Sequence, residues 1–206
     1  MTTLLLGTPV DGVRALAEGL GADLVELPLG DDDATLEAWR NEVGSGPPVD
    51  RIVVAAWVDA PAPGVVDDLD PASWEARTEA PLAAWVIGLG AAVRRCPDGG
   101  TIVAVVERPA PLDCHGWAPE SAVSDAVEAL TRSLGRSEGP RGVRVNAVTT
   151  PSRLTTGEVV MPPPPLASFP GTVEHDVVGA VRLLLDEGAS GLTGTVLHAD
   201  AGRSWR

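Results

Sequence analysis

The chain has 206 residues, enough for one domain with a full hydrophobic core, and 44% of them are hydrophobic. Fifteen basic residues, all arginine, stand against 29 acidic ones and give a formal net charge of −14, which opposes binding to nucleic acid and anionic membranes. No apolar run is long enough to span a bilayer, and the N-terminus lacks the basic segment of a signal peptide. We therefore expect a cytoplasmic protein.

Apolar runs alternate with apolar residues at helical spacing through the first half of the chain. In chain order they predict a strand at Thr3–Gly7, a helix at Pro9–Leu20, a strand at Ala22–Leu27, a helix at Asp31–Val43, a strand at Arg51–Trp57 and a helix at Pro71–Arg95. Two features support the helix starts: three carboxylates open the second helix, and Asp70 followed by Pro71 opens the third. Pro81 lies inside that third helix and is expected to kink it.

The second half continues the alternation. It predicts a strand at Thr101–Val106, a helix at Pro119–Leu134, a strand at Val143–Val148, a proline-rich loop at Pro151–Gly171, a helix at Val173–Glu187 and a strand at Gly194–His198. Alternating strands and helices indicate a doubly wound, Rossmann-like three-layer α/β sandwich. We expect one domain over residues 1–206, with about six parallel strands.

Three segments carry a family resemblance. The stretch AVEALTRSLGRSEGPRGVRVNAV at Ala126–Val148, the stretch SGLTGTVLHADAG at Ser190–Gly202 and the helix at Val173–Glu187 resemble the short-chain dehydrogenase/reductase family. The segment LDPASW at Leu69–Trp74 is similar to the start of that family's long interface helix. The resemblance implies a fold that binds NAD(P). Only one strand–helix unit lies between Gly21 and Pro48, where the family has two, so the resemblance implies the strand order 2-1-3-4-5-6, one strand fewer than in the family.

The resemblance also places the family's catalytic set on this chain. The catalytic Tyr falls on Glu120, its Lys on Ser124, the catalytic Ser near Glu107 and the Asn near Pro81. The sequence contains no Tyr and no Lys to which a shifted alignment could move. In the family the phenol transfers the substrate proton and the ammonium lowers its pKa, so this chain is not expected to perform that hydride transfer alone. Glu120 is either an acid–base group or a favourable charge on a helix N-terminus.

The family's cofactor motifs are degenerate as well. The glycine-rich turn keeps Gly7 but has Asp11 and Val13 in place of its other two glycines. Asp11 either repels the cofactor's pyrophosphate or caps the helix, and Val13 is expected to crowd the pyrophosphate. The motif after the middle strand becomes Ala55, Ala56 and Trp57, followed by Val58, and Trp57 either fills the cofactor space or lies in ordinary core. No cofactor is expected, unless the chain is an NAD(P)-related oxidoreductase after all.

The three histidines and two cysteines are the remaining candidate site residues. His115, beside Asp113 and Cys114, is a possible nucleophilic site, although neighbouring loop residues rarely face one another. His198 is interpreted as structural and His175 as exposed. The two cysteines, of which Cys96 needs no role, have no metal-ligand spacing, so no metal is expected.

The leading hypothesis is an inactive member that serves as an oligomer partner of an active ketoreductase or dehydrogenase. Resemblance to the family implies pairing through helices 71–95 and 119–134, as a homo-oligomer or with an active paralogue, and without nucleic acid or membrane. These two helices carry more apolar residues than one sheet face needs, so a second subunit is expected to cover the excess. The residues are Trp85, Val86, Leu89, Val93, Val123, Val127, Leu130 and Leu134. The alternatives are an enzyme that uses Glu107, His115 or Glu120 in a remodelled cleft, and a homodimeric binding protein.

Overall fold

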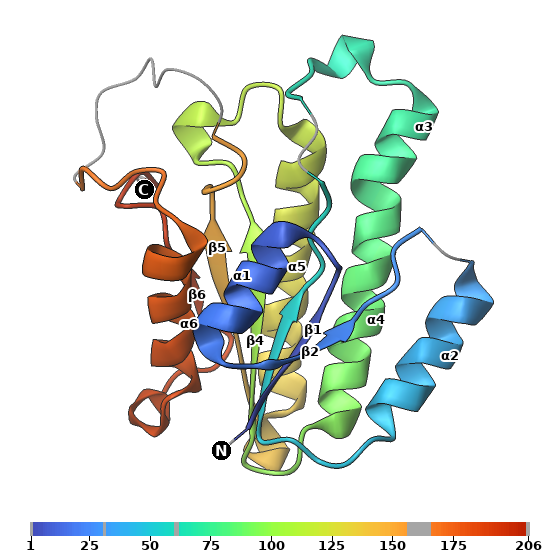
Figure 1. Cartoon of the computed structure of the whole chain (residues 1–206), viewed down its shortest axis with the longest axis vertical. Coiled ribbons are helices and arrows are strands. Elements are labelled where there is room, and N and C mark those ends of the chain that lie inside the picture. Colours follow the sequence, from blue (N-terminus) through green and yellow to red (C-terminus); the bar gives the residue numbers. More distant parts are fainter. Residues whose placement is uncertain (1, 31, 60–61, 156–165, 205–206) are drawn as a thin grey trace.

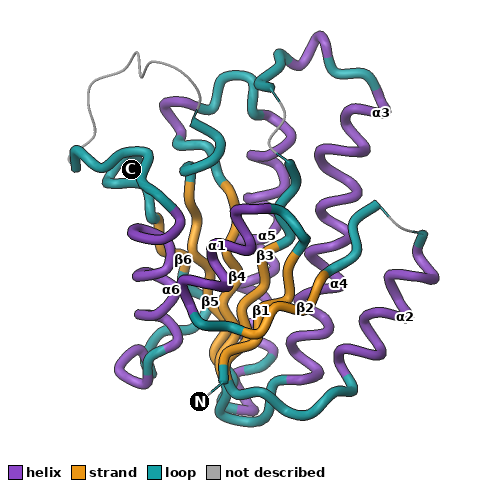
Figure 2. Tube along the Cα trace, in the orientation of Figure 1, coloured by secondary structure: helices purple, strands orange, loops and turns teal. Residues whose placement is uncertain are grey.

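A computed structural model of the chain describes residues 2–30, 32–59, 62–155 and 166–204. Six strands form one parallel sheet in the order β2-β1-β3-β4-β5-β6, which confirms the predicted topology (Figure 2). Their bounds are β1 Thr3–Gly7, β2 Asp23–Glu26, β3 Arg51–Ala55, β4 Thr101–Glu107, β5 Arg144–Thr150 and β6 Val196–His198. The chain order reverses direction between β1 and β3, and ligand crevices of open α/β sheets lie at such a switch point.

Helices cover both faces of the sheet (Figure 1). Their bounds are α1 Asp11–Leu20, α2 Asp33–Gly44, α3 Pro71–Trp74, α4 Ala80–Arg95, α5 Ala118–Ser137 and α6 Val178–Leu185. Helices α1 and α6 pack together on one face, while α4 packs between α2 and α5 on the other. This is the expected three-layer α/β sandwich.

The predicted helix at 71–95 consists of three consecutive helical segments. Asp70 accepts a hydrogen bond from the Ser73 backbone N–H at 2.7 Å and Pro71 follows it, which confirms the predicted start. A π-helical segment at Glu75–Glu79 then joins α3 to α4, immediately before Pro81. A proline lacks the N–H that a regular α-helix needs, and a wider turn accommodates this loss.

Several predicted ends differ from the structure by a few residues. Helix α1 begins at Asp11 rather than Pro9, and β3 ends at Ala55 rather than Trp57. A second π-helical segment, Val173–Val177, precedes α6. Residues 156–165 of the predicted proline-rich loop lie outside the described residues. Among the described residues, no helix is both long and apolar enough to cross a membrane.

The apolar residues expected at a subunit contact lie mostly in this chain's own core. Trp85, Leu89 and Val123 are buried, and Val127 is fully buried. The idea that these four residues exceed what the sheet can cover is therefore wrong. Of the eight, Val86 is the one that the structure leaves exposed, at 46%.

Replacing Val127 with Asp is expected to prevent folding rather than to yield a folded monomer. The side chain has no exposed surface, so the carboxylate would be buried without a partner, at a cost on the order of 3–5 kcal/mol. Urea unfolding followed by circular dichroism measures the loss. Ala129→Asp, at an exposed position of the same helix, is the control and should unfold like the wild type. A folded Val127→Asp protein of unchanged stability would contradict the assignment.

Candidate functional site

The candidate site is the crevice where the carboxyl ends of β1, β3, β4 and β5 meet the start of α1. Gly7 ends β1, and a side chain there would collide with Val13, which is fully buried. Val13 therefore packs against the sheet, in contrast to the expectation that it crowds the crevice. Asp11 is the first residue of α1, its side chain is fully exposed, and it pairs with Arg14 at 3.4 Å.

Neither interpretation of Asp11 gains support from this geometry. The N-cap position belongs to Val10, without a side-chain hydrogen bond, so the capping interpretation is wrong. A fully exposed carboxylate is screened by water and salt, so its repulsion of a phosphate is weak.

Trp57 lies beside the crevice and belongs to the hydrophobic core. It is 2% exposed, and its indole N–H donates to the Val105 carbonyl oxygen at 2.6 Å. Its ring also approaches the first turn of α1, since a methyl group at Gly12 would come within 2.9 Å of it. Ala55 and Ala56 are buried in the strand end that carries it. The interpretation of Trp57 as a core residue is therefore confirmed, and the interpretation that it takes up cofactor space stays a prediction.

Arg153, which sequence reasoning did not single out, closes the same space. It donates to the Val58 carbonyl oxygen at 2.6 Å, and its guanidinium lies 5.4 Å from the centre of the Trp57 ring. A methyl group at Gly12 would come within 2.8 Å of its Cδ. Its Nε also lies 3.3 Å from a Glu107 carboxylate oxygen. We call these two side chains the Trp57–Arg153 plug.

Glu107 and Glu120 line one small cavity beside the plug. The cavity has a volume of about 30 Å³, which is room for a water molecule, and Pro81 and Arg77 also line it. The structure thus brings together the positions to which the resemblance assigned the family's Ser, Tyr and Asn. Ser124 is buried on α5, where its hydroxyl donates to the Ser121 carbonyl oxygen at 2.9 Å.

The two carboxylates have different partners. Arg77 donates two hydrogen bonds of 2.8 Å to Glu120, which makes a bidentate ion pair. Among the described residues, Glu107 pairs only with Arg153, and its Oε1 makes no hydrogen bond to any of them. Burial raises the pKa of Glu107 to about 7, against the opposing effect of Arg153 and with a smaller contribution from Glu120. Glu107 can therefore exchange a proton near neutral pH.

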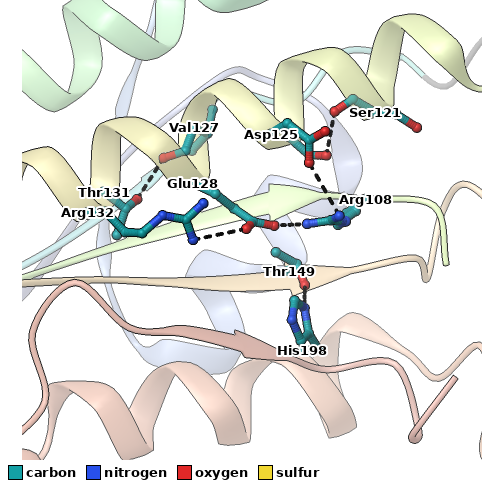
Figure 3. A network of polar contacts seen from close by, with 10 residues as sticks. Arg108, Ser121, Asp125, Val127, Glu128, Thr131, Arg132, Thr149 and His198 are labelled. Carbon is teal, nitrogen blue, oxygen red and sulfur yellow. Dashed lines mark hydrogen bonds and ion pairs between the residues drawn. The ribbon is translucent and has the colours of Figure 1, made fainter. Parts of the chain in front are cut away.

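A buried network fixes the end of β4, where Glu107 lies. Glu128 of α5 is 3% exposed and pairs with Arg108, the residue after Glu107, and with Arg132 at 3.4 Å (Figure 3). Arg108 also pairs with Asp125 at 3.3 Å. Two arginines compensate the buried carboxylate, as such a charge requires.

The histidine and cysteine candidates do not converge. Arg203 holds Asp113 through two hydrogen bonds, the Cys114 thiol donates to the Pro111 carbonyl oxygen, and His115 is exposed. His198 lies 2.7 Å from the Thr149 hydroxyl through its Nδ1 (Figure 3), and His175 is exposed. Burial raises the pKa of Cys96 to about 11. Among the described residues there is no group of three or more metal-ligating side chains.

A second, open groove of about 480 Å³ lies at the ends of β1 and β2. Glu26, the last residue of β2, lines it, nineteen residues after Gly7. In dinucleotide-binding folds an acidic residue about 20 residues after the first glycine binds the ribose. This spacing is a signal that sequence reasoning missed. The open groove and the Trp57–Arg153 plug both adjoin the turn at the start of α1.

Residues 6–161 match the family model described as enoyl-(acyl carrier protein) reductase. The chain belongs to this family. The match confirms the resemblance to short-chain dehydrogenases/reductases. The family's NADH-dependent enoyl-[acyl-carrier-protein] reductase from Rickettsia bellii is 31% identical over 114 residues, which cover 51% of this chain and 44% of that protein. The matched stretch thus spans less than half the length of this curated relative.

Solved structures of short-chain dehydrogenases/reductases share the fold. A member from Serratia marcescens has a TM-score of 0.73 at 20% identity, covering 99% of this chain and 98% of the other. Acetoin dehydrogenase from Enterobacter cloacae has a TM-score of 0.74 at 19% identity, covering 98% and 96%. At these identities the likeness establishes the fold of the chain and nothing further.

Replacing Glu107 with Gln is expected to change how stability depends on pH. The usual pKa of the group is 4.5 and the folded pKa is about 7, so the folded chain holds this proton over a range where the unfolded chain has lost it. The contribution is fully present below about pH 4.5 and is lost as pH rises through 7. Between pH 5 and 8 the wild type should therefore lose roughly 2 kcal/mol more than Glu107→Gln in urea unfolding. Glu42→Gln, at an exposed position, is the control, and equal pH dependence in all three proteins would contradict the burial argument.

Proposed function

We propose that this chain is a family member that does not transfer hydride from a dinucleotide on its own and serves as a binding subunit beside an active reductase. The observation that carries the proposal is the Trp57–Arg153 plug, which takes up the crevice at the switch point. The absence of Tyr and Lys from the sequence supports it, because no side chain can then replace the family's phenol and ammonium.

The subunit role draws on the surface that the fold leaves open. Helices α4 and α5 keep the positions through which the family resemblance implies pairing, and Val86 on α4 is 46% exposed. The partner in a hetero-oligomer is an active reductase of the same family, paired through these helices. A homo-oligomer of this chain through the same helices is the alternative. If a co-purified reductase were equally active and equally stable without this chain, the subunit role would be wrong.

A second candidate is a reductase that works without the family's tyrosine. The pKa of Glu107 near 7 favours it, since a buried carboxyl that is partly protonated at neutral pH is suited to donate a proton. The matched relative is a reductase by name. Glu107→Gln separates the two candidates: it should abolish any turnover of the second kind and leave a binding subunit functional.

The purified chain is expected to bind neither NADH nor NADPH at tens of micromolar. A dinucleotide would have to displace both side chains of the plug, which together make two hydrogen bonds, an ion pair and a ring contact. Calorimetric titration measures this, with an active enoyl reductase of the family as the positive control. A dissociation constant near one micromolar for this chain would contradict the proposal.

A further inference from the structure

Helix α4 has an unusual composition for a helix with a solvent-exposed side. From Ala80 to Val93 it contains no charged residue. A helix that is apolar all round is normally buried all round. Here Trp85 and Leu89 are buried against the sheet, but Val86 is 46% exposed and Leu82 is half-buried. One side of α4 therefore lacks cover in the single chain.

The uncovered side faces α2. At the C-terminal end of α2 the two helices are in close contact: Gly44 packs against Arg94, and the Arg94 guanidinium donates to the Asn41 side chain at 2.6 Å. Toward the other end of α2 the helices diverge (Figures 1 and 2). A groove of about 650 Å³ opens between them. We call it the α2–α4 groove; its apolar floor is formed by Leu36, Leu82, Ala83, Val86 and Ile87.

Acidic residues form the rim of this groove on both sides. Asp33 and Glu37 line it from α2, and Glu79 lines it from the residue before α4. Glu37 pairs with Arg40 at 3.0 Å, which leaves the rim with a net negative charge. The wider protein adds to this potential, with a formal charge of −14. An apolar floor between acidic walls complements an apolar surface flanked by basic residues.

We propose that the α2–α4 groove binds an amphipathic helix of a partner protein, with apolar residues on one face and arginine or lysine beside that face. The proposal rests on the proposed function, because it specifies which kind of partner surface the binding subunit contacts. The V-shaped opening between two helices suits a third helix, whose apolar side chains would lie on Val86 and Leu82. The basic residues would then face Glu37 and Glu79.

Charge excludes a second copy of this chain as the natural occupant. An isologous contact brings the same patch of each copy together, so Asp33, Glu37 and Glu79 would meet their own counterparts. Like charges across an interface suppress such a pairing. The partner is therefore a different, basic helix.

The test uses two synthetic helical peptides of 18 residues. Both carry leucines along one face, and the positions beside that face are arginine in one peptide and glutamate in the other. Fluorescence anisotropy with the full chain in 0.15 M salt should show the arginine peptide binding at least tenfold more tightly. Glu37→Gln combined with Glu79→Gln should weaken the arginine peptide severalfold and reduce the salt dependence of its affinity.

The Val86→Asp variant separates the groove from general attraction to an acidic protein. It adds a negative charge, so non-specific attraction would make the arginine peptide bind more tightly, whereas loss of the apolar floor should weaken it at least tenfold. Leu183→Asp is the matched control, because Leu183 is an exposed leucine of α6 on the opposite face, at 57%. Circular dichroism confirms that both variants fold. Tighter or unchanged binding to Val86→Asp, or equal weakening by Leu183→Asp, would overturn the proposal.

Two further outcomes are decisive. A wild-type dimer in sedimentation that Val86→Asp converts to a monomer would place a second copy in the groove and overturn the basic partner. Oxidation of NADH by the wild type would overturn the proposed function while leaving the peptide comparison as it stands. The peptide experiments can therefore refute binding at the α2–α4 groove independently of the proposed function, which the NADH measurement tests.

Discussion

The contact between the Arg153 guanidinium and the Trp57 ring joins the elements around the switch point of this fold. Arg153 comes from the segment after β5, yet it reaches the end of β3 through Val58, the end of β4 through Glu107 and the first turn of α1 at Gly12. A planar, permanently charged guanidinium can make an ion pair, a hydrogen bond and a ring contact at the same time. One side chain thereby connects the four elements around the switch point.

The same arginine explains why two neighbouring carboxylates differ. Arg153 is shared among several partners and contributes only one ion pair to Glu107, whereas Arg77 is devoted to Glu120 through two hydrogen bonds. Burial therefore dominates at Glu107 and raises its pKa. The positions assigned to the family's catalytic residues thus hold a compensated charge and a poorly compensated one, beside a cavity of about 30 Å³.

Sequence periodicity predicted the strands and helices to within a few residues, because buried parallel strands and amphipathic helices have distinct patterns. The order of the strands followed from the family resemblance. The resemblance also identified the places of Glu107 and Glu120. It could not predict that Arg153 and Arg77 face these residues, since such contacts join segments more than 40 positions apart. Val123, Val127, Leu130 and Leu134 recur at helical spacing, but periodicity alone does not say whether such a stripe faces the chain's own sheet or a second subunit. The spacing from Gly7 to Glu26, typical of a ribose-binding acidic residue, is present in the sequence. It was missed because the glycine-rich turn after Gly7 is degenerate.

The central claim is that Trp57 and Arg153 themselves occupy the crevice, and tryptophan indole N–H signals in a proton–nitrogen NMR spectrum test it most directly. Trp57→Phe assigns the signal of Trp57, whose N–H is bonded to the Val105 carbonyl oxygen. If the plug excludes dinucleotides, millimolar NADH should leave this signal in place and its exchange with deuterium slow. A saturable shift of the Trp57 signal on adding NADH, with faster exchange, would show that the plug opens for the cofactor and would contradict the account.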